Sequence, residues 1–334
     1  MTQLKLALYG TNGHQVARLV PRLERVSVVA VAGVAEETFE AWRGEMPQAF
    51  ERASRYKTLP ALLERADAQL ISICSPRRDQ QHDDIVAALR AGLHVYAEKP
   101  LATSLEGLEA IAQAADEAGK EVRSMTGMPY DPVFRAIKKQ VDEGSLGTVV
   151  QVFAQKSYPY HDRRPQDPGV DGGLIPQAGI HAVSVVRYVT GMEFEEVFAT
   201  ATGRGNPGEG ALDMAAHVAA RLTGGALCTI ACNYCNPPGI GYWGNDQLRL
   251  HGTGGMVEAV DGLTRTQVAL GDQAPAPLET PTDGTAGYPG LFAGYVAHLL
   301  DGTPMLLTQE DSLANTRVVL RAQESARRGE PLRV

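Results

Sequence analysis

The sequence of 334 residues contains only four cysteines, which argues against a metal centre built from thiolates. Cys232 and Cys235 form a lone C-x-x-C pair, whereas a structural zinc site usually needs four protein ligands. Cys74 lies in an apolar run. We therefore expect reduced cysteines in the core or in strands, in preference to redox use, and no bound metal.

The sequence also lacks a long apolar run and an excess of positive charge. No run approaches the roughly 20 apolar residues that cross a bilayer. The segment Met1–Lys5 leads directly into a short apolar run, without the features of a signal peptide. Lys and Arg number 31 against 39 Asp and Glu, a net charge of −8, which disfavours nucleic acid and anionic membranes as partners. We expect a cytoplasmic protein that binds neither.

Short apolar runs alternate with helical periodicity over residues 1–127. Continuous apolar strands separated by helices indicate a doubly wound parallel sheet that is covered on both faces, an α/β domain. Ser104 is suited to an N-cap and Gly119 to the end of the same helix. The expected strands are 4–9, 28–34, 69–74, 93–97 and 121–125, and the expected helices are 14–25, 81–91 and 104–118.

Residues 128–334 follow a different pattern, in which strand-like segments are joined by glycine-rich turns such as Thr223–Gly225 and Gly252–Gly255. Such turns are typical of hairpins, so we expect a second, α+β domain with a mostly antiparallel open sheet and helices on one face. The expected strands are 148–157, 197–202, 214–222, 226–233, 247–251 and 256–260. The expected helices are 132–143, 291–300 and 309–328, with a surface loop over 272–290.

A glycine-containing turn follows the first expected strand. In a β–turn–α opening, backbone N–H groups and the start of the helix bind a pyrophosphate. The G-x-G-x-x-G spacing is incomplete here, because Asn12 takes the second position and Gln15 the third. Asn tolerates a left-handed backbone better than most residues. The alternative is an ordinary tight turn. The candidate dinucleotide-binding residues of this turn are Gly10, Thr11, Asn12, Gly13 and His14.

The end of the second strand bears on the choice of cofactor. A cofactor with a free 2′-hydroxyl usually meets an acidic residue there, but this chain has Gly33. No basic residue stands on the same loop to favour a 2′-phosphate. Arg77 and Arg78, after the strand that ends at Cys74, either reach the adenosine end or are solvated surface charges. NAD and NADP therefore both remain open.

Two polar clusters predict one site that contains a lysine and a histidine. Glu98-Lys99-Pro100 follows the strand 93–97, at the rim of a parallel sheet where ligands bind in open α/β folds. The second cluster, Gly172–His181, begins with a glycine pair. The alternatives are that Lys99 is a surface lysine and that His181 is a core histidine.

These motifs, together with Ser75-Pro76 and the run Ala88–Val95, resemble the glucose–fructose oxidoreductase, inositol dehydrogenase and rhizopine-catabolism (Gfo/Idh/MocA) family over nearly the whole chain. The resemblance implies an N-terminal Rossmann domain over 1–127 and a substrate-binding domain over 128–334, whose open sheet often forms oligomer contacts. We therefore expect a homo-oligomer, a dimer or tetramer. The resemblance also implies hydride transfer between NAD or NADP and a hydroxyl carbon of a sugar, sugar derivative or cyclitol.

The resemblance implies individual roles as well. Lys99 matches a lysine that contacts substrate oxygen and nicotinamide, and His181 matches a general acid/base. Gln177 is the third candidate catalytic residue. The candidate cofactor-binding residues are Gly10, Thr11, Asn12, Gly13, His14, Gly33, Ser75, Pro76, Arg77, Glu98 and Lys99. The candidate substrate-binding residues are Lys99, Tyr158, His161, Gln177 and His181.

Two positions depart from the family pattern, because Gln177 and Ser184 stand where aspartates are usual. Gln177 and His181 are four residues apart and are expected to share a helix face. A glutamine cannot raise the pKa of the histidine as a carboxylate does. Two alternatives follow from these departures. In one, tightly bound NAD assists elimination or glycoside cleavage. In the other, the protein is a non-catalytic ligand-binding or regulatory homologue.

Overall fold

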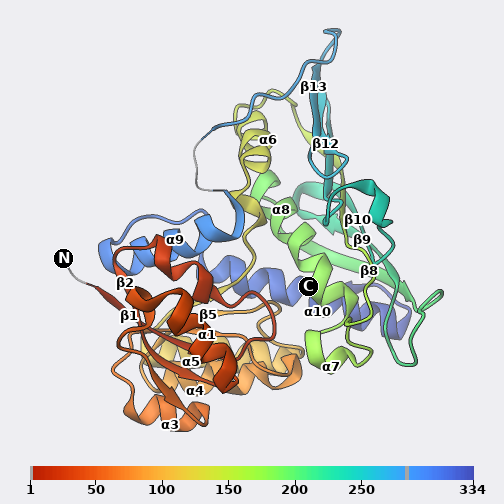
Figure 1. The fold of residues 1–334 in the computed structure, drawn as a ribbon. Helices are drawn as coiled ribbons and strands as arrows, with labels where there is room; N and C mark the ends of the chain where they lie inside the picture. The colour runs from red at the N-terminus through yellow and green to blue at the C-terminus, as the bar shows by residue number, and fades with distance from the viewer. Residues whose placement is uncertain (1–2, 283–285) are drawn as a thin grey trace. The chain divides into compact units, whose positions relative to one another are not determined.

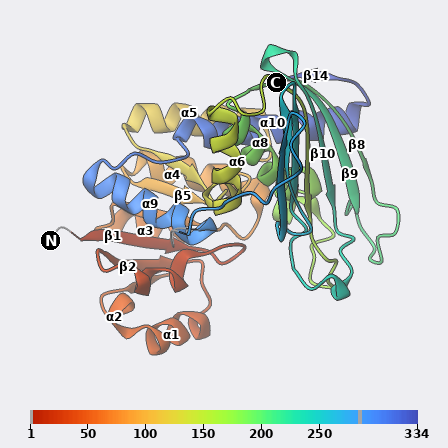
Figure 2. The same cartoon turned by 90° about the horizontal axis from the view of Figure 1, so that it is seen from above.

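The computed structural model describes residues 3–282 and 286–334 and divides into two compact units, each built on one sheet (Figures 1 and 2). The first unit contains Met1–Met125, Gly169–Asp171 and Tyr288–Leu313. The second contains Thr126–Pro168, Gly172–Gly287 and Ala314–Val334. The predicted division after residue 127 lies near the first of these boundaries. Nothing in the sequence pattern indicated that residues 288–313 belong to the first unit.

The sheet of the first unit has six strands in the order β3-β2-β1-β4-β5-β6, and every neighbouring pair is parallel. This confirms the predicted α/β class. The strands are β1 Leu4–Tyr9, β2 Val26–Ala32, β3 Ser54–Tyr56, β4 Leu70–Ile73, β5 His94–Ala97 and β6 Val122–Ser124. The helices are α1 Glu36–Glu45, α2 Pro47–Phe50, α3 Leu59–Arg65, α4 Gln81–Arg90, α5 Leu105–Ala118 and α9 Gly287–Asp301.

The helix predicted over 14–25 is wrong. Two short 3₁₀ turns form instead, η1 Val16–Arg18 and η2 Val20–Arg22. Pro21 has no N–H to donate to a preceding turn, so a continuous α-helix cannot run through it. The predicted caps of α5 are confirmed, since Ser104 Oγ accepts from Gly107 N–H at 3.0 Å and Gly119 is left-handed with φ 59°.

The sheet of the second unit has eight strands in the order β13-β12-β11-β7-β10-β9-β8-β14, and only the β7–β10 pair is parallel. The mostly antiparallel sheet is therefore confirmed. The strands are β7 Val149–Ser157, β8 Phe194–Thr202, β9 Ala215–Leu222, β10 Leu227–Asn233, β11 Gln247–Gly252, β12 Gly255–Val260, β13 Arg265–Leu270 and β14 Leu332–Arg333. The other helices are α6 Pro132–Asp142, α7 Pro168–Asp171, α8 Ile180–Thr190 and α10 Gln309–Arg328.

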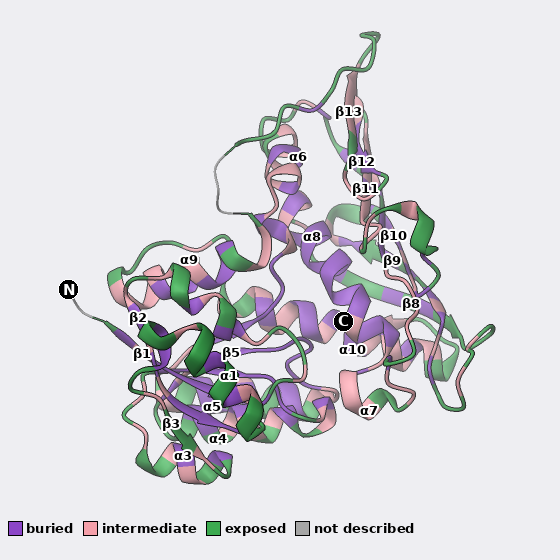
Figure 3. Ribbon diagram, in the orientation of Figure 1, coloured by how far each residue is buried: buried purple, intermediate pink, exposed green. Residues whose placement is uncertain are grey.

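The core of the second unit lies between α8 and one face of its sheet. α8 is apolar on nearly all sides and almost completely buried, as expected of a helix enclosed by its neighbours (Figure 3). Along β9, buried and exposed residues alternate, so that one sheet face is covered and the other is open. Phe153, Phe198 and Leu227 remain exposed in these strands.

Three further expectations have definite outcomes. The loop predicted over 272–290 is wrong at its end, because α9 begins at Gly287; residues 283–285 lie outside the described residues. Cys74, Cys228 and Cys232 are buried, as predicted, whereas Cys235 is exposed. Across 3–282 and 286–334, no helix is both long and apolar enough to cross a membrane.

Candidate functional site

The turn after β1 passes so close to its neighbours that two of its positions require glycine. Gly10 has φ +69°, and a Cβ there would come within 2.0 Å of the Cys74 carbonyl oxygen. Gly13 has φ +131°, and its Cβ would come within 2.2 Å of Glu98 Oε2. Thr11, Gly13 and His14 are exposed. The turn therefore forms a glycine cradle, which a side chain would fill, at the carboxyl edge of the sheet, and it fits a bound dinucleotide.

Two polar side chains hold the backbone of this turn. Gln15, at the third position of the fingerprint, donates to the Gly10 carbonyl at 2.9 Å and accepts from Val16 N–H at 2.9 Å. Arg78 is buried and donates to the Asn12 carbonyl at 2.8 Å. The interpretation of Arg78 as a solvated surface charge is therefore wrong. Since only a 3₁₀ turn follows, the cradle has backbone N–H groups without a long helix behind them.

The remaining candidates of the first unit surround this turn. Asn12 Nδ2 donates to the carbonyls of Pro76 at 3.0 Å and Val170 at 2.9 Å, so Asn12 and Pro76 are neighbours, as the predicted cluster requires. Ser75 is buried, and its hydroxyl donates to Asp84 Oδ2 at 2.6 Å. Burial raises the pKa of Asp84, and the bond from Ser75 opposes that shift. Arg77 forms an ion pair with Asp79 at 2.7 Å.

Glu98 and Lys99 form a buried ionic pair after β5. Glu98 is 2% exposed and Lys99 is 3% exposed, and their charged groups lie 3.9 Å apart. Lys99 is therefore not a solvated surface lysine. Glu98 Oε2 also accepts from the backbone N–H of His14 and lies 2.8 Å from His14 Nδ1. Burial by itself raises the pKa of Glu98, but His14, Lys99 and Arg78 together hold it well below its usual range.

Gln81, in the first turn of α4, fixes the backbone around Lys99. Its side-chain amide donates to the carbonyl oxygens of Glu98 at 2.6 Å and Pro100 at 2.9 Å. Gln81 is fully buried, so these bonds are shielded from water. The lysine therefore extends from a segment that is held on both sides.

Tyr288, at the start of α9, contacts the same turn from a distant part of the sequence. Its hydroxyl donates to the His14 carbonyl, and the two rings lie 5.5 Å apart. Burial raises the pKa of Tyr288 far above its ordinary value, so the hydroxyl remains a donor. The sequence pattern placed this residue in a surface loop and contained no signal for the contact.

A basic residue does lie beside the loop that follows β2, although it comes from β3. Arg55 donates to the Val34 carbonyl from Nε at 3.2 Å and from Nη2 at 3.1 Å. Its Nη1 lies 3.8 Å from Glu36 Oε2. Gly33 itself has φ +65°, and a Cβ there would come within 2.8 Å of the Tyr9 ring. The sequence pattern did not indicate this neighbouring cation, because β3 was not predicted.

In the second unit, the segment from Gly172 to His181 does not form one α-helix. Residues Ile175–Gly179 form a π-helical turn, and α8 begins at Ile180. The spacing behind the predicted shared face assumed α-helical turns, whereas a π-helical turn holds Gln177 and leads directly into α8. Gln177 lies in the wider turn and His181 in the first turn of α8, and such π turns frequently occur at functional sites. Tyr234 Oη donates to Gln177 Oε1 at 3.2 Å.

His181 and Ser184 lie on the buried α8. His181 is 7% exposed and Ser184 is 1% exposed. The Ser184 hydroxyl, which replaces the usual carboxylate, has no hydrogen-bond partner among the described residues of the chain. α8 therefore carries a buried hydroxyl whose hydrogen-bonding capacity the described residues do not satisfy.

Tyr158 and His161 belong to an aromatic and basic cluster beyond the parallel ends of β7 and β10. The Trp243 ring stacks on His161 at 5.9 Å and lies 6.3 Å from Tyr158. Lys156 forms an ion pair with Asp246 at 2.6 Å, and its Nζ lies 4.8 Å from the centre of the Tyr158 ring. Burial, and then nearby arginines, lower the pKa of His161, so its imidazole favours the neutral form. The structure thus brings together two of the predicted substrate-binding residues.

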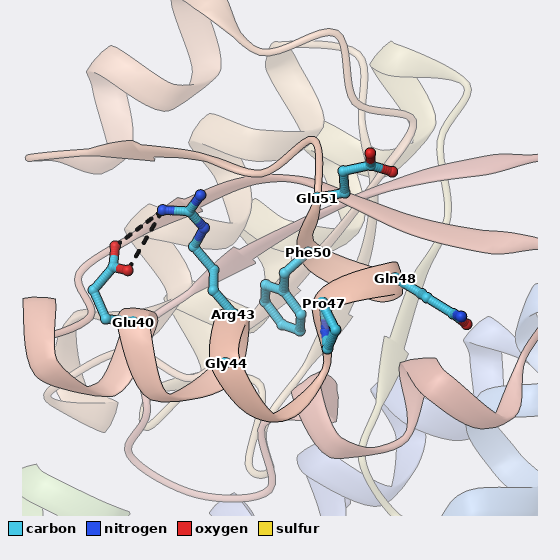
Figure 4. Close-up of a pocket in the computed structure, with 7 residues that line it drawn as sticks. All are labelled: Glu40, Arg43, Gly44, Pro47, Gln48, Phe50 and Glu51. Carbon is cyan, nitrogen blue, oxygen red and sulfur yellow. Dashed lines mark hydrogen bonds and ion pairs between the residues drawn. The ribbon is translucent and has the colours of Figure 1, made fainter.

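The first unit also contains a hollow whose lining residues differ from all candidate site residues (Figure 4). It is formed by the second half of α1 and by α2, and the Arg43–Glu40 ion pair of 3.2 Å lies at its wall. The residues that line it are Glu40, Arg43, Gly44, Pro47, Gln48, Phe50 and Glu51. None of them is a candidate site residue, and we assign this hollow no role.

Two family models match the chain. One, described as an oxidoreductase family with an NAD-binding Rossmann fold, matches residues 5–126. The other, described as the GFO/IDH/MocA C-terminal domain, matches residues 134–258. Together with the parallel sheet and the glycine cradle, the first match shows that residues 5–126 form a nicotinamide dinucleotide-binding domain.

Individual relatives agree with these matches. The chain is 30% identical over 190 residues to inositol 2-dehydrogenase of Rhizobium meliloti, a match that covers 54% of this chain and 56% of that enzyme. The chain thus spans only a little more than half of that relative. It is 25% identical over 335 residues to D-xylose 1-dehydrogenase (NADP(+)) 2 of Haloferax volcanii, covering 98% of each chain.

Solved structures extend the likeness to the whole fold. A Thermotoga maritima protein described as a candidate oxidoreductase has a TM-score of 0.88 at 27% identity, over 99% of this chain and 100% of that one. The aldose–aldose oxidoreductase of Caulobacter crescentus has a TM-score of 0.84 at 22% identity, over 99% and 100% of the two chains, a likeness that concerns the fold alone. The chain belongs to the Gfo/Idh/MocA family of oxidoreductases.

Proposed function

We propose that this protein is an NAD(P)-dependent dehydrogenase that acts on a hydroxyl carbon of a sugar, sugar derivative or cyclitol. The observation that carries the proposal is the buried Lys99, held by Glu98 at the carboxyl edge of a parallel sheet and beside a glycine cradle. Relatives named as inositol and xylose dehydrogenases support this substrate class.

The bound nicotinamide supplies hydride-transfer chemistry, and the protein supplies orientation and proton transfer. In this proposal Lys99 binds the reacting oxygen of the substrate through its ammonium group. His181 accepts the hydroxyl proton as the carbon is oxidised and returns it in the reverse direction. A positioned base of this kind contributes about 10²- to 10⁴-fold to the rate.

Gln177 has a positioning role in this proposal. Its amide carbonyl accepts a hydrogen bond from Tyr234, which restrains the side chain, and its amide nitrogen is a donor suited to a substrate hydroxyl. Because a neutral amide is not a base at neutral pH, Gln177 does not take the proton, and His181 has that role in this proposal.

The cytoplasmic location stays a prediction of the sequence.

Steady-state turnover over a panel of aldoses, polyols and inositols, followed by nicotinamide absorbance with NAD and with NADP, tests the proposal. Lys99→Ala is expected to abolish turnover while circular dichroism shows that the fold is kept; its melting temperature is expected to fall, because the buried Glu98 loses one of its cations. Lys57→Ala, which alters an exposed lysine of the same unit, serves as the matched control. Unchanged turnover in Lys99→Ala would reject the assigned role.

The replacement of a carboxylate by Gln177 favours a second candidate, in which the cofactor stays bound and transient oxidation assists elimination or glycoside cleavage. That reaction would form product without a net change in nicotinamide absorbance. Binding of cofactor and sugar without any turnover across the panel would instead indicate a ligand-binding or regulatory protein.

A further inference from the structure

Arg164 is a buried cation for which the described part of the chain supplies no neutralising carboxylate. Arg164 is only 6% exposed, and its Nε has no hydrogen-bond partner among the described residues. Within 3–282 and 286–334, no carboxylate forms an ion pair with this guanidinium, and its donors make no side-chain hydrogen bond. An arginine cannot lose its proton in a protein, so the charge persists.

The neighbouring aromatic rings offset only part of the free-energy cost of burying the Arg164 charge. The guanidinium carbon lies 3.7 Å from the centre of the Tyr234 ring and 5.9 Å from the centre of the Tyr158 ring. Cation–π attraction to these rings is favourable. Among the described residues, however, Nε has no acceptor and is shielded from solvent, and no carboxylate offsets the charge; burying an unpaired charge is costly.

The neighbouring lysine shows the contrast. Lys156 is also buried and also lies over the Tyr158 ring, but Asp246 neutralises it at 2.6 Å. The same cluster thus contains one cation with a protein partner and one without. A positive charge is therefore left over among the aromatic rings.

Contacts join Arg164 to the candidate substrate residues. Tyr234, on whose ring the guanidinium lies, donates its hydroxyl to Gln177. The backbone N–H of Arg164 donates to the His161 carbonyl at 2.9 Å, and His161 stacks on Trp243, which is 59% exposed. The unneutralised charge therefore lies among residues assigned to substrate binding, and the cluster reaches solvent at Trp243.

We propose that Arg164 binds an anionic group of the substrate, so that the substrate is a sugar or cyclitol derivative with a carboxylate or a phosphate ester. This inference rests on the proposed function, whose substrate class it narrows. The planar guanidinium forms two parallel hydrogen bonds with either anion, which a neutral hydroxyl cannot match. The anion supplies the acceptors that the protein lacks at this position.

Isothermal titration calorimetry with the full chain and saturating nicotinamide cofactor tests the inference independently of turnover. The probes are D-glucuronate, D-galacturonate, glucose 6-phosphate and galactose 6-phosphate, each compared with its neutral hexose. At least one anionic probe is expected to bind about 10- to 100-fold more tightly than its neutral counterpart. The uronates and the phosphates distinguish the two anions.

Arg164→Met is expected to remove this preference, and Arg164→Lys to keep part of it, because a lysine retains the charge without the planar fork. Arg163→Met, which alters the exposed neighbouring arginine, is the matched control and should leave the preference unchanged. If Arg164→Met does not fold, the inference is still tested by comparing the anion preference of Arg164→Lys with that of the wild type.

Equal binding of neutral and anionic probes by the wild type, binding of no anionic probe, or an undiminished preference in Arg164→Met would overturn the inference. The proposed function has a separate readout. Turnover of neutral sugars without anion preference would keep the dehydrogenase and reject the role of Arg164. A preference for anionic probes without any change in nicotinamide absorbance would keep the role of Arg164 and reject the dehydrogenase.

Discussion

Gly13 lies against the carboxylate of Glu98, so closely that a Cβ atom at Gly13 would come within 2.2 Å of Glu98 Oε2. The same carboxylate group binds His14 and faces the ammonium of Lys99 at 3.9 Å. One buried carboxylate therefore connects the glycine cradle after β1 with the lysine after β5. The geometry of the cradle and the position of Lys99 are not independent.

Gly13→Ala is expected to reduce stability and to abolish high-affinity cofactor binding. The added Cβ collides with Glu98, and the left-handed backbone strain costs a further 1–3 kcal/mol, roughly. Denaturant unfolding and cofactor titration measure the two effects. Gly144→Ala is the control, since Gly144 has φ +71° but nothing within 4 Å of its Cβ position. Equal losses in both variants would show that strain, and not the Glu98 contact, explains the effect.

Glu98→Gln is expected to destabilise the fold by about 3–5 kcal/mol at neutral pH, because it removes the buried carboxylate charge that faces the ammonium of Lys99. The pKa of Glu98 is lowered in the folded protein from its ordinary value of 4.5. Its contribution is thus complete above pH 4.5 and declines as the pH falls further. Unfolding curves across that range should show the wild-type advantage shrinking with acid; an advantage that is independent of pH would contradict this account.

Gln177→Asp is expected to shift the acidic limb of the kcat/KM profile to higher pH, by about one unit. A carboxylate in the turn before α8 favours the protonated imidazole of His181, and the base must be neutral to accept a proton. Turnover measured as a function of pH checks the shift. Gln177→Glu tests whether the effect follows the charge, and an unshifted profile in both variants would exclude His181 as the titrating base.

Arg55→Ala is expected to weaken NADP binding about tenfold while it leaves NAD binding nearly unchanged. Gly33 presents no carboxylate to repel a 2′-phosphate, and the Arg55 guanidinium is held at the carbonyl of Val34 on the same loop. Competitive titration with both cofactors measures the ratio. Arg43→Ala, which alters the arginine paired with Glu40 on α1, is the control. A parallel loss of both cofactors would indicate a structural role only.

Phe198→Glu is expected to weaken self-association. Phe153 on β7 and Phe198 on β8 lie in one row across the sheet, with β10 and β9 between them. They are 39% and 41% exposed, and exposed apolar side chains of this kind commonly mark homo-oligomer interfaces. Light scattering coupled to size-exclusion chromatography measures the mass. Leu306→Glu alters a residue that is 42% exposed in the first unit and should leave the mass unchanged. A monomeric wild type would reject the predicted oligomer.

Local sequence patterns predicted most of the first sheet and the positions of the key backbone features. Continuous apolar runs marked β1, β2, β4 and β5, and the residues Ser104 and Gly119 marked the ends of α5, because these signals depend on residues near in the chain. The glycine turn and the lysine after β5 were identified in the same way. Short or partly exposed elements such as β3 and β13 were missed, since they carry weak periodicity.

Local patterns along the chain were sufficient to predict the two kinds of sheet, the glycine turn after β1 and the functional groups available at Lys99 and His181. The surroundings of those groups could be seen only in the folded protein. Arg78 is buried and holds the backbone of the turn at Asn12, and Tyr288 contacts His14. Arg164 is a buried cation for which the described residues supply no carboxylate. These outcomes depend on contacts between residues far apart in the chain, and burial and charge compensation arise only when such residues meet.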